Sequence, residues 1–331
     1  MKRLNIAYFG SPDFSADFLE KLIIDTSIKR LIEVKLVVTQ PDQKVGRKQI
    51  LTPTLVKKVA LNFENLKIEN SLKIENLKLK IKELDLVLLY AFGAIIPKEL
   101  LDLPKLGFWC IHPSILPKYR GTSPMTTALI NGDKTTGVTI IKMDEKIDHG
   151  PIIAQEEYKI LPTDKRPDLE TKLTDLAFEM FKKTINVIAS GAKQSLPAGR
   201  QGQKKIASSS STPRDDILAA LTPQQHELAS YTKKLTKQDG FIEFQKLKFS
   251  TGSNYKGHYS SSEVEKLFNL FRGLYPWPGL WTILPNGKRL KITDMELARN
   301  RHACSLQIKR VQLEGKKEVD FETFKKAYKI F

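Results

Sequence analysis

The chain has 331 residues, of which 41% are hydrophobic and 27% charged, and its formal net charge is +17. These values are those of an ordinary globular protein that is long enough for two domains. The longest apolar run, residues 86–97, is too short to cross a bilayer, and the N-terminal residues lack a signal-peptide pattern. The two cysteines, Cys110 and Cys304, form neither a metal-ligand spacing nor a disulfide framework, so we predict a cytoplasmic protein without a metal.

The first 190 residues alternate between short apolar runs and segments of helical spacing. The first run, LNIAYFG, ends at Gly10, and a turn then leads into apolar residues with a helical period. The other predicted strands are EVKLVVTQ, ENLKIEN, LDLVLLYAFG, GFWCIH and GVTIIKM. Strands that alternate with helices, some of them uniformly apolar, are typical of a sheet covered on both faces. We therefore predict a Rossmann-like α/β domain over residues 1–190, built on an open and mostly parallel sheet.

The remaining chain differs in composition and in the length of its apolar runs. Residues 191–220 are rich in Gly, Ser, Pro and Lys, and we predict a linker or insertion there. Beyond it the apolar runs are shorter, and Asn286-Gly287 between two of them is a strong hairpin signal. Basic residues interleave with apolar ones along these runs. The pattern favours a small β-barrel of the oligonucleotide-binding (OB) type over residues 221–331.

Most of the excess positive charge lies in the C-terminal third. Residues 231–331 carry 20 basic and 10 acidic side chains. A basic segment on a nearly balanced body indicates a polyanionic partner, of which nucleic acid is the commonest. The alternative is a general lysine bias, which the Lys-rich stretch 57–83 also shows.

A proline-rich loop, HPSILPKYRG, follows the strand predicted at 107–112. Ligands of open parallel sheets bind beyond the carboxyl ends of the strands, where His112 lies. Asp148 follows the next strand and its turn, so both side chains could face one crevice. A His held by an Asp is a common arrangement for proton transfer or for stabilising a developing charge. Taken alone, the pair leaves purely structural roles open for both residues.

The string from Cys110 to Gly121, followed by the Asp-His-Gly at 148–150, resembles the signature of the formyltransferases that use 10-formyltetrahydrofolate. In that family the loop runs Asn-x-His-x-Ser-[Leu/Ile]-Leu-Pro shortly before a Gly, and the Asp lies on a later loop. The likeness covers nearly the whole chain apart from insertions around 191–215 and 249–260. It extends to FGSPDF, TQPDQKVGR, YAFGAIIPKELLDLP, YTKKLTKQDGFIEF, YPWPG and VQLEGKKEVDFETF.

The resemblance implies a reaction and two substrates. The formyl group would pass from 10-formyltetrahydrofolate, a co-substrate rather than a tightly bound cofactor, to the α-amino group of methionine on initiator tRNA. His112, steered by Asp148, would hydrogen-bond the developing oxyanion or assist proton transfer. We expect a monomer that binds no membrane. Two segments would line the folate pocket: Tyr90, Ala91, Phe92 and Gly93, and Ser114, Ile115, Leu116 and Pro117.

The basic loop at 40–50 contains Lys44, Arg47 and Lys48. The resemblance implies that this loop contacts the tRNA acceptor stem, where initiator tRNA lacks a firm first base pair. Proteins that recognise RNA favour such unpaired ends. The alternative is a solvated loop without a partner. The basic C-terminal domain would hold phosphates with little sequence preference, so tRNA binding should weaken with salt.

Cys110 departs from the family pattern, which has Asn at this position. Asn is a good N–H donor and a thiol is a weak one, and the loss of one oxyanion donor typically costs about 10²–10³ in rate. Three explanations are open: a slower or retuned transferase, a catalytically impaired relative that binds tRNA, or a changed reaction in which Cys110 transiently accepts the formyl group. A formyltransferase for an amino-sugar nucleotide is a further alternative, which the basic C-terminal domain argues against.

Overall fold

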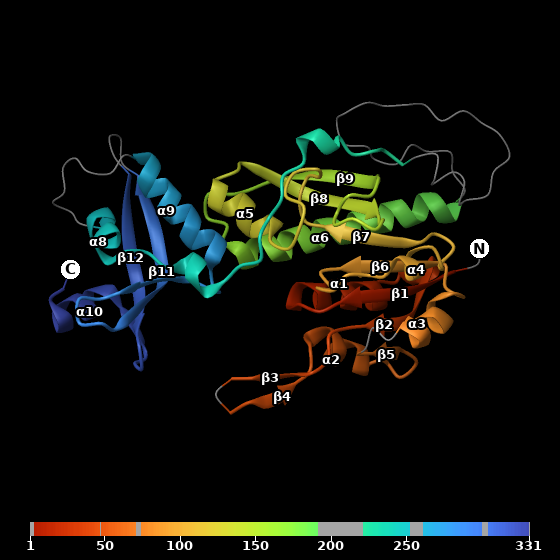
Figure 1. Ribbon diagram of the computed structural model, residues 1–331, viewed down its shortest axis with the longest axis horizontal. Coiled ribbons are helices and arrows are strands. Elements are labelled where there is room, and N and C mark those ends of the chain that lie inside the picture. Colours follow the sequence, from red (N-terminus) through yellow and green to blue (C-terminus); the bar gives the residue numbers. More distant parts are fainter. Residues whose placement is uncertain are drawn as a thin grey trace. The chain divides into compact units, whose positions relative to one another are not determined.

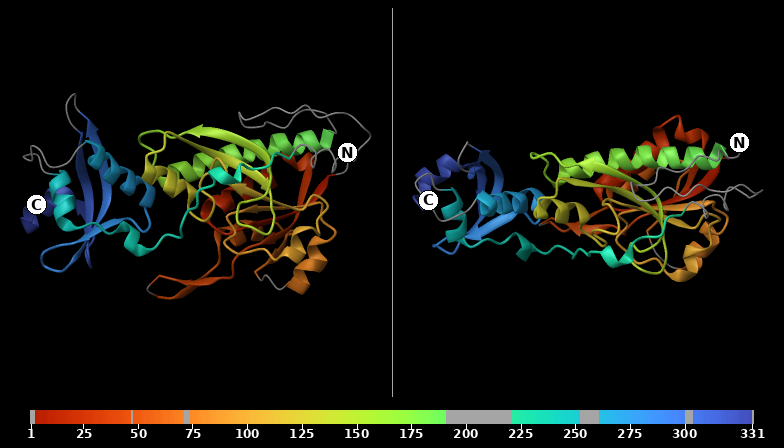
Figure 2. Two further views of the ribbon diagram at one scale, coloured as in Figure 1. Left: turned by 45° about the horizontal axis from the view of Figure 1, so that its top comes forward. Right: turned by 90° about the horizontal axis from the view of Figure 1, so that it is seen from above.

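The computed structural model describes residues 3–46, 48–70, 74–190, 221–251, 261–299 and 304–330 (Figure 1; Figure 2). The chain forms two compact units. The first comprises Met1–Thr122, Thr135–Lys159 and Glu170–Tyr231, and the second comprises Ser123–Lys134, Ile160–Leu169 and Thr232–Phe331. The linker predicted at 191–220 lies outside the described residues.

A seven-stranded sheet forms the centre of the first unit, with the strand order β5-β2-β1-β6-β7-β8-β9. The strands from β5 to β7 in this order run parallel, whereas β8 and β9 are antiparallel to their neighbours. This arrangement confirms the predicted Rossmann-like, mostly parallel sheet. The strands are β1 (Leu4–Gly10), β2 (Ile32–Val38), β5 (Lys67–Glu69), β6 (Leu86–Tyr90), β7 (Phe108–His112), β8 (Thr135–Lys142) and β9 (Ile152–Lys159).

Helices cover both faces of this sheet because its central strands are apolar on both sides. On one face Tyr90 of β6 packs against Phe18, and Trp109 of β7 packs against Phe181. On the other face Cys110 belongs to a buried cluster that includes residues of α3 and α4. The helical elements up to residue 190 are α1 (Asp13–Ile24), η1 (Ile28–Arg30), α2 (Leu55–Leu61), α3 (Ile74–Ile81), α4 (Lys98–Leu101), α5 (Pro124–Asn131) and α6 (Arg166–Ser190).

The basic loop at 40–50 contains a short hairpin that the sequence reading did not predict. Strand β3 (Gln43–Val45) pairs antiparallel with β4 (Ile50–Thr52). Gly46 and Gln49 adopt left-handed backbone conformations that reverse the chain between the two strands. Figure 1 shows the hairpin extending away from the sheet.

The C-terminal part of the second unit, where we predicted a small β-barrel of the OB type, contains a four-stranded antiparallel sheet of order β10-β11-β12-β13. Asn286-Gly287 lies in the turn between β10 and β11, which confirms the predicted hairpin. Helix α9 contributes Phe271 to a buried core with these strands. Among the described helices, none has the length and apolarity that a membrane span needs. The elements are η2 (His226–Leu228), η3 (Lys237–Gly240), α8 (Phe244–Thr251), α9 (Ser261–Leu274), β10 (Leu280–Ile283), β11 (Arg289–Arg299), β12 (Cys304–Leu313), β13 (Glu318–Asp320) and α10 (Phe321–Tyr328).

Candidate active site

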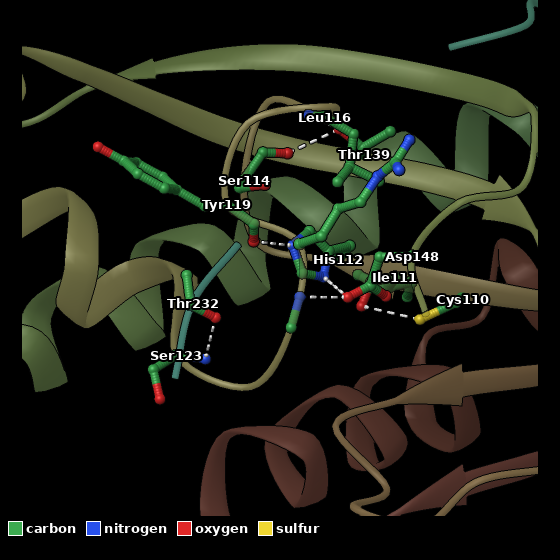
Figure 3. Close-up of polar contacts among 12 residues, drawn as sticks. Cys110, Ile111, His112, Ser114, Leu116, Tyr119, Ser123, Thr139, Asp148 and Thr232 are labelled. Atoms are coloured by element: carbon green, nitrogen blue, oxygen red, sulfur yellow. Dashed lines mark hydrogen bonds and ion pairs between the residues drawn. The ribbon is translucent and has the colours of Figure 1, made fainter. Parts of the chain in front are cut away.

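His112 is the last residue of β7, and its side chain is buried. The ring atom Nε2 lies 2.9 Å from the carbonyl oxygen of Tyr119 (Figure 3). A carbonyl oxygen only accepts hydrogen bonds, so Nε2 carries a proton in this arrangement. The other ring nitrogen, Nδ1, lies 3.4 Å from Oδ2 of Asp148. The imidazole is therefore fixed between a backbone carbonyl and a carboxylate.

Asp148 is held in place by backbone contacts as well as by the ring. Its Oδ2 accepts a 2.7 Å hydrogen bond from the backbone N–H of Gly121. Its own backbone has a left-handed conformation, φ 48°, which side-chain-bearing residues seldom adopt. Two residues further on, Gly150 leaves no room for a side chain, because a Cβ there would lie 1.8 Å from the carbonyl oxygen of Lys142. The structure thus brings His112 and Asp148 together through a constrained loop.

Cys110 lies two residues before His112, on the face of β7 that carries the buried cluster. Its Sγ donates a weak hydrogen bond to the carbonyl oxygen of Ile111 at 3.7 Å (Figure 3). Burial, with a smaller contribution from the negative charge of Asp148, raises the pKa of the Cys110 thiol well above its ordinary value. The thiol therefore stays protonated near neutral pH, as a weak donor rather than a nucleophile.

The loop after β7 is fixed by a hydrogen-bond network centred on Thr139 of β8. The Thr139 hydroxyl donates to the carbonyl oxygen of Ser114 and accepts from the backbone N–H of Leu116, at 2.6 and 3.1 Å. Gln155 of β9 donates from Nε2 to the Thr139 hydroxyl and to the Leu116 carbonyl oxygen, both at 2.9 Å. Ser114 Oγ donates to the carbonyl oxygen of Lys118. Ile115 and Pro117 are half-buried between these anchored residues.

The segment Tyr90–Gly93 does not present all its side chains on one side of the sheet. Tyr90 is fully buried among α1 and α6 and shares a 3.1 Å hydrogen bond with Thr174 of α6. Phe92 packs on the opposite face, in the same buried cluster as Cys110 and Leu116. Ala91 is half-buried and Gly93 is exposed. Only part of this segment therefore lies on the Cys110 side of the sheet.

The predicted tRNA contacts lie on the β3–β4 hairpin. Lys44 in β3 and Lys48 in the turn are both exposed, and Arg47 lies outside the described residues. The apolar side chains of Val45, Ile50 and Leu51 are exposed beside them. The hairpin therefore presents both basic and apolar side chains to solvent.

Three residues around the His112–Asp148 pair were not predicted from the sequence. Tyr119 acts through its carbonyl oxygen, which any residue would supply, so no sequence signal marks it. Gln155 begins the polar half of β9 and carries no clear sequence signal, whereas Thr139 is a polar residue inside an otherwise apolar run. That placement is a usable signal because buried polar side chains require partners.

A His–Asp pair at the carboxyl end of a strand, within a Rossmann-like sheet, is typical of an α/β enzyme that moves protons or stabilises developing charge. Comparison with known proteins identifies the family. The formyl transferase family model matches residues 4–185, and the model of the formyl transferase C-terminal domain matches residues 259–306. The chain belongs to the formyltransferase family and is an enzyme that transfers formyl groups.

Individual relatives support this assignment. The chain is 32% identical to a methionyl-tRNA formyltransferase of Caldicellulosiruptor saccharolyticus, over 99% of this chain and 98% of the relative. It is 34% identical to one of Staphylococcus aureus, over 88% and 79%. Among solved structures, a 4-N formyltransferase of Francisella tularensis has a TM-score of 0.58 at 18% identity, over 90% of this chain and 99% of that one. That similarity shows the shared fold.

Proposed function

We propose that the protein transfers the formyl group of 10-formyltetrahydrofolate to the α-amino group of methionine on initiator tRNA, as a cytoplasmic monomer that serves translation initiation. The observation that carries the chemistry is the fixed His112–Asp148 pair. The acceptor is supported by relatives named methionyl-tRNA formyltransferase, which match this chain over nearly its full length.

In this reaction the α-amino nitrogen forms a bond to the formyl carbon, and the bond from that carbon to the folate nitrogen breaks. The formyl oxygen carries negative charge in the tetrahedral intermediate, and a proton passes from the amine to the departing folate nitrogen. The Nε2 atom of His112 is engaged by the Tyr119 carbonyl, so the Nδ1–Asp148 side of the ring is the part that serves proton transfer or charge stabilisation.

Cys110 supplies less to this chemistry than the family's Asn would. A protonated, buried thiol offers one weak donor, and in the structure that donor points to the carbonyl of Ile111. Its raised pKa also argues against attack by a thiolate on the formyl carbon. Of the three explanations for Cys110, a slower or retuned transferase is the one we propose.

Two parts of the chain would provide for the substrates. We place the folate donor against Ala91, Gly93 and the loop Ser114–Pro117, whose backbone is anchored by Thr139. The exposed lysines of the β3–β4 hairpin would contact the tRNA acceptor end. The basic residues of 231–331 would add contacts to phosphates.

The test is formylation of charged initiator methionyl-tRNA with 10-formyltetrahydrofolate, for the native chain, His112→Ala, Cys110→Asn and Cys110→Ala. We expect activity in the native chain, its loss in His112→Ala, and a gain of about 10-fold or more in Cys110→Asn because an amide restores a strong donor. Activity only in Cys110→Asn would identify a catalytically impaired relative. Inactivity of all four proteins would contradict the tRNA acceptor, and amino-sugar nucleotides would then be assayed.

A further inference from the structure

One segment far along the chain lies against the loops that carry the catalytic pair. Residues 222–231 belong to the first unit and run beside its antiparallel edge (Figure 1; Figure 2). The segment is attached at both ends, by paired backbone hydrogen bonds between Thr222 and Ile152 and by a bridge between Tyr231 and Arg120. Between these ends, Gln224 is almost completely buried.

The side-chain amide of Gln224 contacts the loop that carries Asp148. Its Nε2 donates to the carbonyl oxygens of Asp148 and Gly150, at 3.0 and 2.7 Å. Both carbonyls belong to the loop in which Asp148 adopts its left-handed conformation and places its carboxylate beside His112. Since carbonyl oxygens only accept, the orientation of the Gln224 amide is defined by its partners.

The other end of the same amide contacts the loop after β7. Oε1 of Gln224 accepts from Nη2 and Nε of Arg120, at 2.6 and 3.2 Å. Arg120 is itself buried and stands between the two backbone groups that hold the catalytic pair. Those groups are the Tyr119 carbonyl, which faces His112, and the Gly121 N–H, which donates to Asp148.

We propose that Gln224 is a positioning residue for formyl transfer, because its amide joins the two loops that set the distance between His112 and Asp148. It touches neither catalytic side chain in the structure and acts through the backbone carbonyls and through Arg120. The inference rests on the proposed function for the identity of the acceptor. It adds to that function a residue, in the segment that follows the predicted linker, on which the rate of formyl transfer depends.

The test replaces Gln224 by Met, which has a similar length but neither donates nor accepts as an amide does. The matched control is Gln225→Met, the same substitution at the exposed neighbouring residue. We expect Gln224→Met to lower kcat by about 10- to 100-fold, with KM for both substrates within about twofold, because a small misplacement of the catalytic pair costs rate rather than binding. Gln225→Met should leave both constants unchanged.

A second variant and a double mutant separate positioning from general stability. Gln224→Glu keeps an oxygen for Arg120 but loses the N–H donors to the Asp148 loop, so it should also lower kcat at an unchanged KM. In an Asp148→Asn background, where a reduced rate remains measurable, Gln224→Met should cause no further loss, because its effect passes through the pair. A fall in melting temperature at unchanged kcat, or losses that multiply in the double mutant, would overturn the proposal.

An acceptor-independent measurement keeps this test distinct from that of the proposed function. The chain has five histidines, so the imidazole carbon–proton signal of His112 can be assigned by its disappearance in His112→Ala. Gln224→Met should shift this signal and Gln225→Met should not. An unchanged signal in Gln224→Met would overturn the positioning role even if the native chain formylated another acceptor. If the native chain is inactive and Gln224→Met still shifts the signal, only the proposed tRNA acceptor is contradicted and the positioning role stands.

Discussion

The loops that carry His112 and Asp148 belong to the same unit as the β3–β4 hairpin but differ from it in burial and in how their side chains are held. His112, Asp148 and the residues around them are buried or half-buried, and their loops are held by hydrogen bonds with β8, β9 and residues 222–231. The hairpin exposes its apolar side chains, with Ile50 60% and Leu51 63% accessible. Chemistry on a developing charge needs groups fixed in advance, whereas a surface that receives a large polyanion needs accessible side chains.

The largest expected effect follows from removing the charge of the Asp148 carboxylate. Asp148→Asn keeps the side chain's size and an oxygen for the Gly121 N–H but loses the negative charge facing His112. We expect kcat to fall by about 10²–10⁴. The control is Asp144→Asn in the same loop, where the carboxylate pairs with His149 instead. A loss below about tenfold in Asp148→Asn would show that the pair is structural.

The second prediction concerns the protonation of Cys110. Because burial raises the pKa of this thiol, the folded protein retains a proton that the unfolded chain loses at mildly alkaline pH. Alkylation of Cys110 by iodoacetamide, followed by peptide-resolved mass spectrometry, should be about 10² slower in the folded than in the unfolded chain at pH 8. Between pH 7 and 9, only the rate at which iodoacetamide alkylates Cys110 in the unfolded chain should rise steeply. Rapid alkylation at pH 7 would restore the formyl-acceptor explanation.

The third prediction weakens the anchored loop without substituting His112 or Asp148. Thr139→Val preserves the shape of the side chain but removes the hydroxyl that contacts Ser114, Leu116 and Gln155. Buried groups left without partners should lower the free energy of unfolding by about 1–3 kcal/mol, measured by urea denaturation. Thr135→Val, at an exposed position of the same strand, is the control. Equal stability of both variants would mean that the network is dispensable.

The central strands of the sheet could be predicted from the sequence because burial on both faces makes them continuously apolar. Strand β6 is the clearest case, with all five residues buried. Strand β9 was missed because its second half carries charged side chains that alternate toward solvent. The three-residue strands β3 and β4 were missed because an exposed hairpin has no buried face to give it a periodic pattern.

The candidate site was only partly predictable, for a different reason. His112 and Asp148 stand in a recognisable motif, so both could be proposed from the sequence. The groups that fix them are backbone carbonyls and N–H groups, which every residue possesses. Gln224 lies 76 residues from Asp148 in the chain, and no local pattern reveals a contact of that range. Tyr90 was grouped with Phe92 by position, but β6 ends at Tyr90, and the left-handed backbone of Ala91 breaks the strand alternation before Phe92 packs on the opposite face.

The fourth prediction addresses the hairpin as a binding surface. Lys44→Ala and Lys48→Ala should each raise KM for tRNA by about threefold to tenfold and leave kcat unchanged, because each removes a charge from phosphate contact. Each substitution should also reduce the slope of log affinity against log salt by about one. Lys29→Ala, at an exposed position in η1, is the control. Unchanged KM and salt slope in both hairpin variants would place the tRNA elsewhere.

The smallest expected effect is the loss of an exposed apolar side chain from the same hairpin. Ile50→Ser should change the free energy of unfolding by less than about 0.5 kcal/mol, because a side chain that is 60% accessible gains little from folding. Leu88→Ala in the buried strand β6 should cost about 2–5 kcal/mol in the same denaturation experiment. A cost above about 1 kcal/mol for Ile50→Ser would show that the hairpin packs within the molecule. If Ile50→Ser leaves stability unchanged but raises KM for tRNA, Ile50 serves binding. Its side chain then makes its apolar contact only when the tRNA is bound.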